Sequence, residues 1–474
     1  MKQQRRIYLL DGLPDETIAV CFARCSRTSE DFATIAEQLN KDFSRRFHER
    51  WVIGYGHSSV AEHAVVHVAI ENVSQLVVEN LQSNRLASYT EKSSRYQVFA
   101  KNRYYIPKKI RQDKQLTEIY QEAVDQLLDL YHRSLDPIKE QVKLMIPRNK
   151  NETEKKYAAR IYSKYIDVAR MLLPVCMLTN LGMTANARSF EYAITKLLSS
   201  PFLEAQEIGQ EMKKVVLGAC PTLVKYAREN KYSAEINRLD FAKETKRILG
   251  KKRLSQRAVR VVWHDRFGQE RFLAAMLYRF GQGDLNTLFR RVKKWSANKK
   301  KKMIEQILSS VGEHDKPPRE LEHVYLTFDC LLDQGAYYDL KRNRMMTQTT
   351  QVLGIGYGYI IPRIWVKAGL KNDYCRAIEK VEKAYQLIAS KYLSEASYLF
   401  TKAHKRRFLM TMNLRELYCF AHLRTSTRGH ASYRRIAMKC LEEARKIYPG
   451  LLHFVHLDHN QSSAEIEKDF FYKV

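Results

Sequence analysis

The sequence has 474 residues, and its content of 45% hydrophobic and 28% charged residues excludes a disordered or fibrous chain. This length exceeds what one hydrophobic core usually spans, so we expect two domains. No apolar run reaches the ~18 residues that a membrane-spanning helix needs, which predicts a soluble, cytoplasmic protein without a signal peptide. The formal net charge of +29 favours phosphate-bearing partners, nucleic acid among them, with a solvated lysine-rich surface as the simpler explanation. The densest basic run, residues 293–302, is expected to be an exposed loop.

The first hundred residues predict alternating strands and helices. A strand is expected at residues 6–10 and a helix at 16–27, and the apolar positions of residues 63–71 suit a buried strand. Helical spacing over residues 74–84 leads into a loop at residues 82–96, QSNRLASYTEKSSRY. This loop contains hydroxyl groups, one carboxylate and two arginines, a combination suited to holding an anion.

Further along the chain the helical pattern dominates. A short strand is expected at residues 103–107, and residues 112–228 are mostly helical in pattern. A charged stretch over residues 230–255, poor in periodic apolar positions, then predicts a join. After the join, residues 257–263 restate the opening strand and residues 270–279 restate the opening helix.

Eight cysteines are scattered along the sequence, and only Cys21 and Cys25 lie close together. This pair has no second cysteine or histidine pair at the spacing of a zinc site. We therefore expect reduced thiols and no metal site.

The restated elements indicate a tandem duplication because their register is kept over a long stretch. His323 corresponds to His63 at an offset of 260 (323 − 63). Beyond the next strand and helix, Arg344 corresponds to Arg85 at an offset of 259 (344 − 85). A slip of a single residue across two elements favours a true repeat over two isolated matches.

A second offset shows where the two copies differ in length. Asn413 corresponds to Asn186 at an offset of 227 (413 − 186), so the first copy carries about thirty extra residues before this point. We expect them to lengthen the helices around residues 112–165. The predicted domains are residues 1–230 and residues 255–474.

Three motifs of the first copy carry a resemblance to a known family. They are residues 56–63 (GHSSVAEH), residues 85–96 (RLASYTEKSSRY) and residues 168–174 (VARMLLP). Together they resemble the flavin-dependent thymidylate synthases, in which a helix ending in Gln-Leu-Val-Arg-His-Arg runs into a loop of the form Ala-Ser-x-x-x-x-Ser-x-Arg-Tyr. The resemblance extends over almost the whole chain and is weaker in the second copy.

The resemblance implies an α+β fold in which each copy is a largely antiparallel sheet flanked by long helices. It implies binding of flavin adenine dinucleotide (FAD) and reductive methylation of the nucleotide deoxyuridine monophosphate (dUMP) to thymidine monophosphate (dTMP). Methylenetetrahydrofolate and NADPH are the implied co-substrates. Because the family forms homotetramers, a tandem chain is expected to form a homodimer that imitates the tetramer.

Each copy keeps a different half of the site that the resemblance implies. The first copy keeps the loop but has Ser83 and Leu197 where the family has arginines. The second copy has Arg-Asn-Arg at residues 342–344 and the late arginine as Arg424, but it has lost the loop serine and arginine at residues 352–354. Complementary loss predicts one composite site per chain.

The predicted site residues combine hydroxyl, carboxylate and guanidinium groups from both copies. Paired arginines can hold a phosphate in a bidentate manner, and an arginine beside the uracil ring can stabilise its developing negative charge. The predicted catalytic residues are Arg424 and Ser93. The predicted substrate-binding residues are Glu91, Ser93, Ser94, Arg95, Arg170, Asp339, Arg342 and Arg424. The predicted flavin-binding residues are Ser59, Glu91, Arg342, Asn343, Arg344, Asn413 and Arg415.

Several alternatives stay open at this point. Asn343 replaces the histidine of the family motif, which removes proton transfer at that position. The protein could therefore be an active thymidylate synthase, a flavoenzyme for another nucleotide, including one within RNA, or a pseudoenzyme that binds nucleotide or nucleic acid. Glu62 and Glu322 could either orient the turn before a strand or contact a cofactor, and His57 could line a folate pocket or satisfy a turn.

Overall fold

The computed structural model describes residues 8, 10, 12–25, 28–39, 58–239, 241–250 and 254–473. His57 and most of the predicted strand at residues 6–10 lie outside these ranges. The chain forms two compact units, which are described separately below. Over the described part of the chain, no helix has the length and apolar character needed to cross a membrane.

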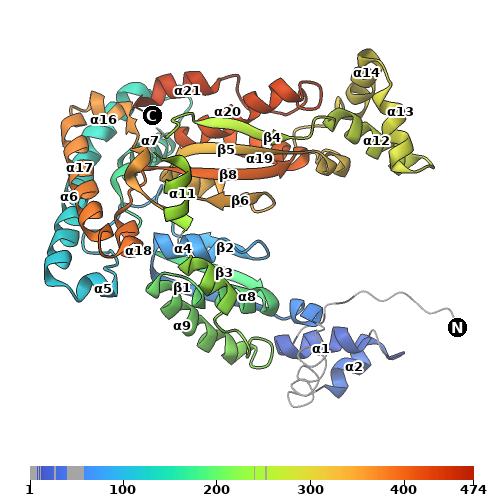
Figure 1. Cartoon of the computed structure of the whole chain (residues 1–474), viewed down its shortest axis with the longest axis horizontal. Helices are drawn as coiled ribbons and strands as arrows, with labels where there is room; N and C mark the ends of the chain where they lie inside the picture. The colour runs from blue at the N-terminus through green and yellow to red at the C-terminus, as the bar shows by residue number, and fades with distance from the viewer. Residues whose placement is uncertain are drawn as a thin grey trace. The chain divides into compact units, whose positions relative to one another are not determined.

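The first unit contains residues 1–92, 104–112 and 176–251. Its antiparallel sheet has the order β1 (Val65–Ser74), β3 (Leu178–Asn186), β2 (Ser88–Glu91). Figure 1 shows α8 and α9 packed against this sheet, where their apolar side chains join the core. The helices of this unit are α1 (Asp15–Cys25), α2 (Phe32–Gln38), η2 (Ser58–Glu62), α4 (Gln75–Leu81), α5 (Lys108–Arg111), α8 (Ala187–Leu198), α9 (Leu203–Ala219), α10 (Lys231–Arg238) and α11 (Phe241–Leu249).

The second unit contains residues 93–103, 113–175 and 252–474. Its antiparallel sheet has the order β4 (Val259–His264), β5 (Tyr325–Asp333), β8 (Lys405–Asn413), β6 (Thr347–Thr350), and a small sheet pairs β7 (Ile361–Pro362) with β9 (Phe471–Lys473). Its helices are α6 (Lys114–Met145), α7 (Glu154–Ala169), η3 (Arg170–Leu172), α12 (Gly268–Phe280), α13 (Leu285–Lys293), α14 (Ala297–Leu308), η4 (Arg319–His323), α15 (Gln334–Leu340), η5 (Ile355–Tyr357), α16 (Arg363–Lys367), α17 (Lys371–Ala389), α18 (Leu393–Ala396), η6 (Ser397–Leu399), α19 (Leu414–Thr425), α20 (Ala431–Ile447) and α21 (Ser463–Phe470).

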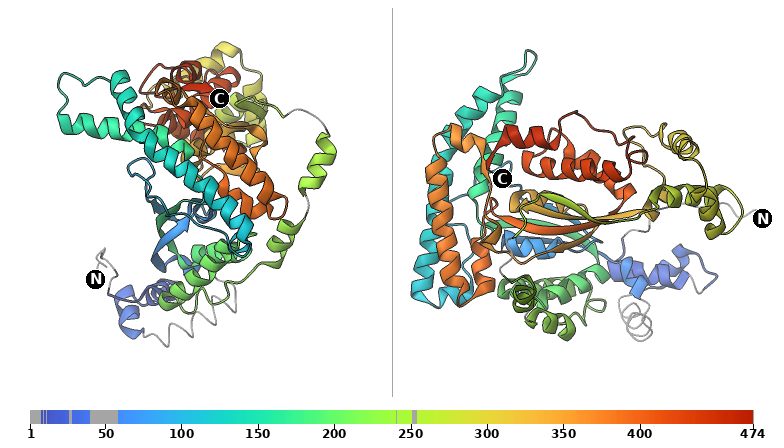
Figure 2. Two further views of the ribbon diagram at one scale, coloured as in Figure 1. Left: turned by 90° about the vertical axis from the view of Figure 1, so that its left-hand side faces the viewer. Right: turned by 45° about the horizontal axis from the view of Figure 1, so that its top comes forward.

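Helices cover the large sheet of the second unit on one face and at both ends. α20 packs across β4 and β5, and its apolar side chains share one core with the sheet. Figure 2 shows α6 running beside α17 at one end of the sheet, while α12, α13 and α14 lie at the opposite end. The chain thus has the predicted α+β fold, with antiparallel sheets flanked by helices.

The registers of the two sheets confirm the duplication. Val65 of β1 pairs with Asn186 of β3, and Tyr325 of β5 pairs with Asn413 of β8. These two pairs are related by offsets of 260 (325 − 65) and 227 (413 − 186), the same offsets that the sequence repeat predicts. Equivalent residues of the two copies therefore form the same pair between the two central strands of each sheet.

The extra residues of the first copy lie where they were expected. α6 has 32 residues and α7 has 16, whereas the corresponding α17 and α18 have 19 and 4. Both long helices belong to the second unit, although they come from the first repeat. The second unit therefore takes its residues from both repeats.

Residues 112–228 are mostly helical, as expected, but they also contain strand β3, in which Leu181, Met183 and Ala185 are buried with the alternation of a strand. Two local expectations were wrong. Lysines 299–302 lie in helix α14 rather than in a loop, because Ser296 caps that helix and its apolar residues reach the core. No regular strand forms at residues 103–107, where the structure has a single bridge from Tyr104 to Met177.

Candidate functional site

The second unit brings Arg95 of the predicted loop into a buried ion pair with Asp167 of α7. Arg95 Nε donates to Asp167 Oδ1 and Oδ2 at 2.8 and 3.0 Å, and Nη2 donates to Oδ2 at 2.8 Å. The side chains are 16% and 3% exposed. Burial alone would lower the pKa of Arg95, but the Asp167 carboxylate raises it above its usual range. Asp167 thus fixes the guanidinium group in a bidentate geometry.

Arg170 lies next to this pair at the end of α7, and it joins groups from both repeats. Its Nη1 donates to Ser94 Oγ at 2.9 Å, its Nε lies 3.3 Å from Asp167 Oδ1, and its Nη2 lies 3.6 Å from Asp339 Oδ2. Arg170 is buried, and its Nε and Nη2 make no hydrogen bond to any residue that the structure describes. The same holds for Asp339 Oδ2. The two nitrogens face carboxylates at ion-pair distance, but their hydrogen bonds are incomplete, and buried polar groups of this kind are costly.

Arg424, the predicted late arginine, is held by Asn343. Arg424 Nε donates to Asn343 Oδ1 at 2.8 Å, and Asn343 Nδ2 donates to Glu416 Oε1 at 3.4 Å. Burial lowers the pKa of Arg424, and the nearby carboxylate of Asp339 acts in the opposite direction. The asparagine in place of the family's histidine therefore orients a guanidinium group, for which an amide oxygen is sufficient.

His430 is a buried neighbour of these arginines that the sequence motifs did not mark. It caps α20, and its Nδ1 accepts a hydrogen bond from the Ser432 backbone N–H at 3.3 Å. Burial and the charges of Arg170 and Arg95 hold the pKa of His430 well below its usual range, so the ring is neutral at pH 7. With Nδ1 accepting, the proton of the neutral ring is on Nε2.

Ser93 and the basic residues after α15 complete the predicted residues of the second unit. Ser93 Oγ accepts from the Arg95 backbone N–H at 3.2 Å, which stabilises the turn of the loop. Arg342 is exposed and forms no hydrogen bond or ion pair with the described part of the chain, whereas Arg344 is half-buried. Arg342 is therefore more accessible to a ligand than Arg344.

Two other predicted flavin residues are already engaged within the protein. Asn413 caps α19 by accepting from the Glu416 N–H at 2.8 Å. Arg415 Nη1 donates to Glu322 Oε1 at 2.6 Å, and its Nε donates to a backbone carbonyl. The first repeat contains the equivalent ion pair between Arg188 and Glu62. Because this pair occurs in both copies, it orients the turn before the central strands.

The two remaining predicted residues belong to the first unit. Ser59 lies in η2, and Glu91 ends β2. Glu91 Oε2 accepts from Gln82 Nε2 at 2.9 Å. Ser59 and Glu91 thus belong to the first unit, whereas the other predicted site residues belong to the second.

Asp167 was missed by the sequence reasoning, although a signal for it was present. It lies three residues before Arg170, a spacing that places two side chains on the same face of a helix. His430 and the Asn343–Arg424 bond had no comparable signal, because they join residues from different elements.

Comparisons with known proteins match both repeats. The family described as thymidylate synthase complementing protein matches residues 8–222 and 254–450. A UPF0159 protein of Chlamydia muridarum is 28% identical over 95% of this chain and 91% of its own length. The flavin-dependent thymidylate synthase of Clostridium tetani is 26% identical over 47% of this chain and 86% of its own length. Among solved structures, the UMP/dUMP methylase PolB from Streptomyces cacaoi, bound with 5-Br dUMP, covers 41% of this chain and 93% of its own, with a TM-score of 0.34 and 15% identity.

Proposed function

The chain belongs to the thymidylate synthase complementing protein family and repeats its domain in tandem, and from this premise we propose that it is a flavin-dependent thymidylate synthase. The proposed reaction is the reductive methylation of dUMP to dTMP, with methylenetetrahydrofolate as donor, FAD as flavin and NADPH as reductant. One observation carries the proposal: within a single compact unit, Arg95 and Arg170 of the first repeat lie with Asp339 and Arg424 of the second. Each chain then holds one composite active site.

The phosphate of the nucleotide is assigned to Arg170 and Ser94. Arg170 has buried nitrogen atoms that lack hydrogen bonds within the described chain, and a phosphate oxygen is the acceptor that they fit. Asp167 orients Arg170 and Arg95 together, so both guanidinium groups are positioned before the ligand arrives. Such preorganisation lowers the entropy that binding costs.

Arg424 is assigned to the base of the nucleotide. Its guanidinium group stays cationic at neutral pH although burial lowers its pKa, and it can stabilise negative charge on the uracil ring. Asn343 holds Arg424 in place but cannot transfer a proton, so the role of this pair is electrostatic. Ser93 shapes the loop that carries the phosphate-binding groups.

The flavin is assigned to the basic residues after α15. Arg342 is exposed and has no ion pair within the described residues, so its charge fits the diphosphate of FAD, and Arg344 lies beside it in sequence. When bound, the flavin supplies the hydride for the reduction. Asn413 and Arg415 stay assigned to its binding, and in the structure they hold α19 and the turn before β5. Ser59 and Glu91, in the first unit, are assigned to it by the family resemblance alone.

We also propose that two chains associate as a cytoplasmic homodimer that carries two composite sites. Similarity to the flavin-dependent thymidylate synthase of C. tetani supports the flavin and the reaction. A nucleotide-binding pseudoenzyme is the second candidate, since Asn343 stands where the family motif has histidine.

The test is flavin absorbance of the purified protein together with tritium release from dUMP labelled at C5. We expect bound flavin and tritium release in the wild type, and their loss in Arg95→Ala and Arg342→Ala. Arg85→Ala is the matched control, because Arg85 is exposed and occupies the position of Arg344 in the abandoned half-site. Equal losses in all three variants would contradict a composite site. Nucleotide binding without flavin or tritium release would favour the pseudoenzyme.

A further inference from the structure

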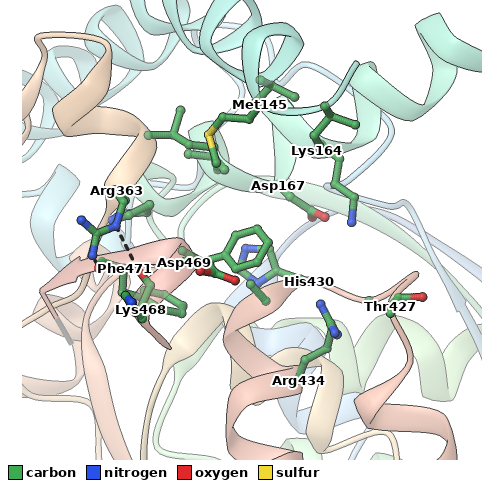
Figure 3. Close-up of a pocket in the computed structure, with 18 of the residues that line it drawn as sticks. Met145, Lys164, Asp167, Arg363, Thr427, His430, Arg434, Lys468, Asp469 and Phe471 are labelled. Carbon is green, nitrogen blue, oxygen red and sulfur yellow. Dashed lines mark hydrogen bonds between the residues drawn. The ribbon is translucent and has the colours of Figure 1, made fainter. Parts of the chain in front are cut away.

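A cavity of about 690 Å³ lies in the second unit, and Asp167, the partner of Arg95, is among the residues that line it. Figure 3 shows its walls, which come from the ends of α6 and α7, from α16, from the start of α20 and from the last residues of the chain. None of the predicted site residues lines it. Its volume lies within the range of small-molecule sites, which is about 300–1,000 Å³.

The cavity combines residues of both repeats with residues that lie beyond the family match. The family match ends at residue 450, yet Gln461 and Phe471 line the cavity. α6 and α7 contribute through the extension that lengthens the first repeat relative to the second. The last residues of the chain and the longer helices of the first repeat thus contribute to its walls.

The cavity presents hydrogen-bond donors and positive charge. Lys164 forms no hydrogen bond or ion pair within the described residues. Burial lowers its pKa, the carboxylate of Asp167 acts in the opposite direction, and the charges of Arg95 and Arg434 lower it further. Arg434 is 3% exposed and donates from Nε to the Thr425 carbonyl and from Nη2 to Gln461, which leaves Nη1 without a hydrogen bond to any described residue. Figure 3 shows Lys164 and Arg434 pointing into the same space from α7 and α20.

His430, which also lines the cavity, adds a neutral donor. Because its Nδ1 accepts from Ser432, its Nε2 carries the proton, and Nε2 has no hydrogen-bond partner among the residues that the structure describes. The two carboxylates that line the cavity already have partners, because Asp167 is shared by Arg95 and Arg170, and Asp469 accepts from Gln461. An anionic ligand would supply acceptors to the donors that remain.

The cavity also has apolar lining residues, which are Val142, Met145, Pro362, Ile364 and Phe471, next to the charged Arg363, Lys468 and Asp469. Apolar side chains of this kind suit an aromatic ring, and methionine adapts its shape to such a ring.

We propose that this cavity binds an organic anion with an aromatic ring, its phosphate or carboxylate group between Lys164, His430 and Arg434. The aromatic ring lies against Met145 and Phe471. Two available sources have this chemistry, a nucleotide and a folate. Asp167 lines the cavity and also holds Arg95 and Arg170. Ligand binding in the cavity is therefore coupled to nucleotide binding at the proposed active site. This coupling rests on the proposed function.

The experiment is isothermal titration of the purified full-length protein with dTMP and, separately, with folic acid. We expect one of the two probes to bind the wild type and to lose about tenfold or more in affinity in Lys164→Met, since a charge-assisted hydrogen bond is removed. Lys156→Met is the matched control on the same helix, because Lys156 is exposed and lies outside the cavity. Lys164→Gln serves as a second variant, and thermal unfolding verifies that all variants fold.

Both probes could also enter the proposed active site, so Arg424→Ala separates the two sites. Binding in the cavity is expected to persist in Arg424→Ala and to weaken in Lys164→Met. Failure of both probes to bind, or binding that is lost in Arg424→Ala and kept in Lys164→Met, would overturn the inference. A parallel titration with dUMP tests the proposed function alone. If dUMP binds but neither probe binds the cavity, the cavity inference has failed. If a probe binds the cavity but dUMP does not bind, the proposed function has failed.

Discussion

Nη2 of Arg170 lies 3.6 Å from Oδ2 of Asp339, and this ion pair joins a residue of the first repeat to a residue of the second within one compact unit. Neither atom makes a hydrogen bond within the described chain. The two side chains are buried and close together, but neither atom would lose a hydrogen bond to a described residue. A ligand can therefore separate them at a small cost in hydrogen bonding. The predictions below start from this pair and its neighbours.

Arg170→Lys is expected to raise the dissociation constant of dUMP by about 10- to 100-fold. Lysine keeps the charge but cannot bond Ser94, Asp167 and a phosphate at once, since it lacks the planar fork of arginine. Isothermal titration measures the effect. Ser397→Ala is the matched control, because Ser397 occupies the position of Arg170 in the second repeat, and an equal loss there would argue against a composite site.

Asn343→Ala is expected to lower kcat by about tenfold or more with a smaller change in KM. The change removes the acceptor that holds Arg424 Nε and leaves a buried guanidinium group free to move from the base. Tritium release from labelled dUMP at saturation gives kcat. Asn84→Ala tests the equivalent position of the first repeat, where activity should be unchanged, and unchanged activity in Asn343→Ala would contradict the role of Arg424.

His430 is expected to make the protein less stable in acid. Its folded pKa is depressed, so the unfolded chain binds the proton first, and the stabilisation present above about pH 6.5 is lost as the pH falls. The loss approaches about 1.4 kcal/mol per pH unit for one group. The free energy of unfolding, measured by denaturant at pH 7 and pH 5, should fall less steeply in His430→Gln than in the wild type. Exposed His314→Gln should follow the wild type.

Lys164→Met is expected to stabilise the protein at pH 7 by about 1 kcal/mol while it removes the cavity ligand. Burial lowers the pKa of Lys164 and no described residue bonds its ammonium group, so a side chain of similar length without charge avoids that cost. Denaturant unfolding of this variant and of Lys156→Met, both without ligand, measures the difference. A destabilised Lys164→Met would show that the lysine serves the fold.

The sequence predicted the tandem duplication through the repeat offsets, and equivalent residues of the two copies take equivalent places in the two sheets. The sequence could not predict that the long helices α6 and α7 of the first repeat would belong to the second compact unit. Apolar periodicity in α6 shows which face is buried, but it does not name the surface that covers that face. Strand β3 was missed because its alternation is short and is followed directly by a helical pattern.

The same reasoning applies to the site. Arg95, Arg170 and Arg424 were predicted because each lies in a short motif, and Asp167 could have been predicted from its spacing to Arg170. The cavity could not, because Lys164, His430 and Phe471 lie in different elements and match no motif. Only the folded chain brings them to one place.

The membership of α6 and α7 in the second unit has a consequence for how such a chain can change. A single cut near residue 240 would leave the second unit divided between two fragments, since residues 93–103 and 113–175 would be on one and residues 252–474 on the other. Neither fragment would contain a complete second unit. We therefore expect the two repeats to depend on each other for folding.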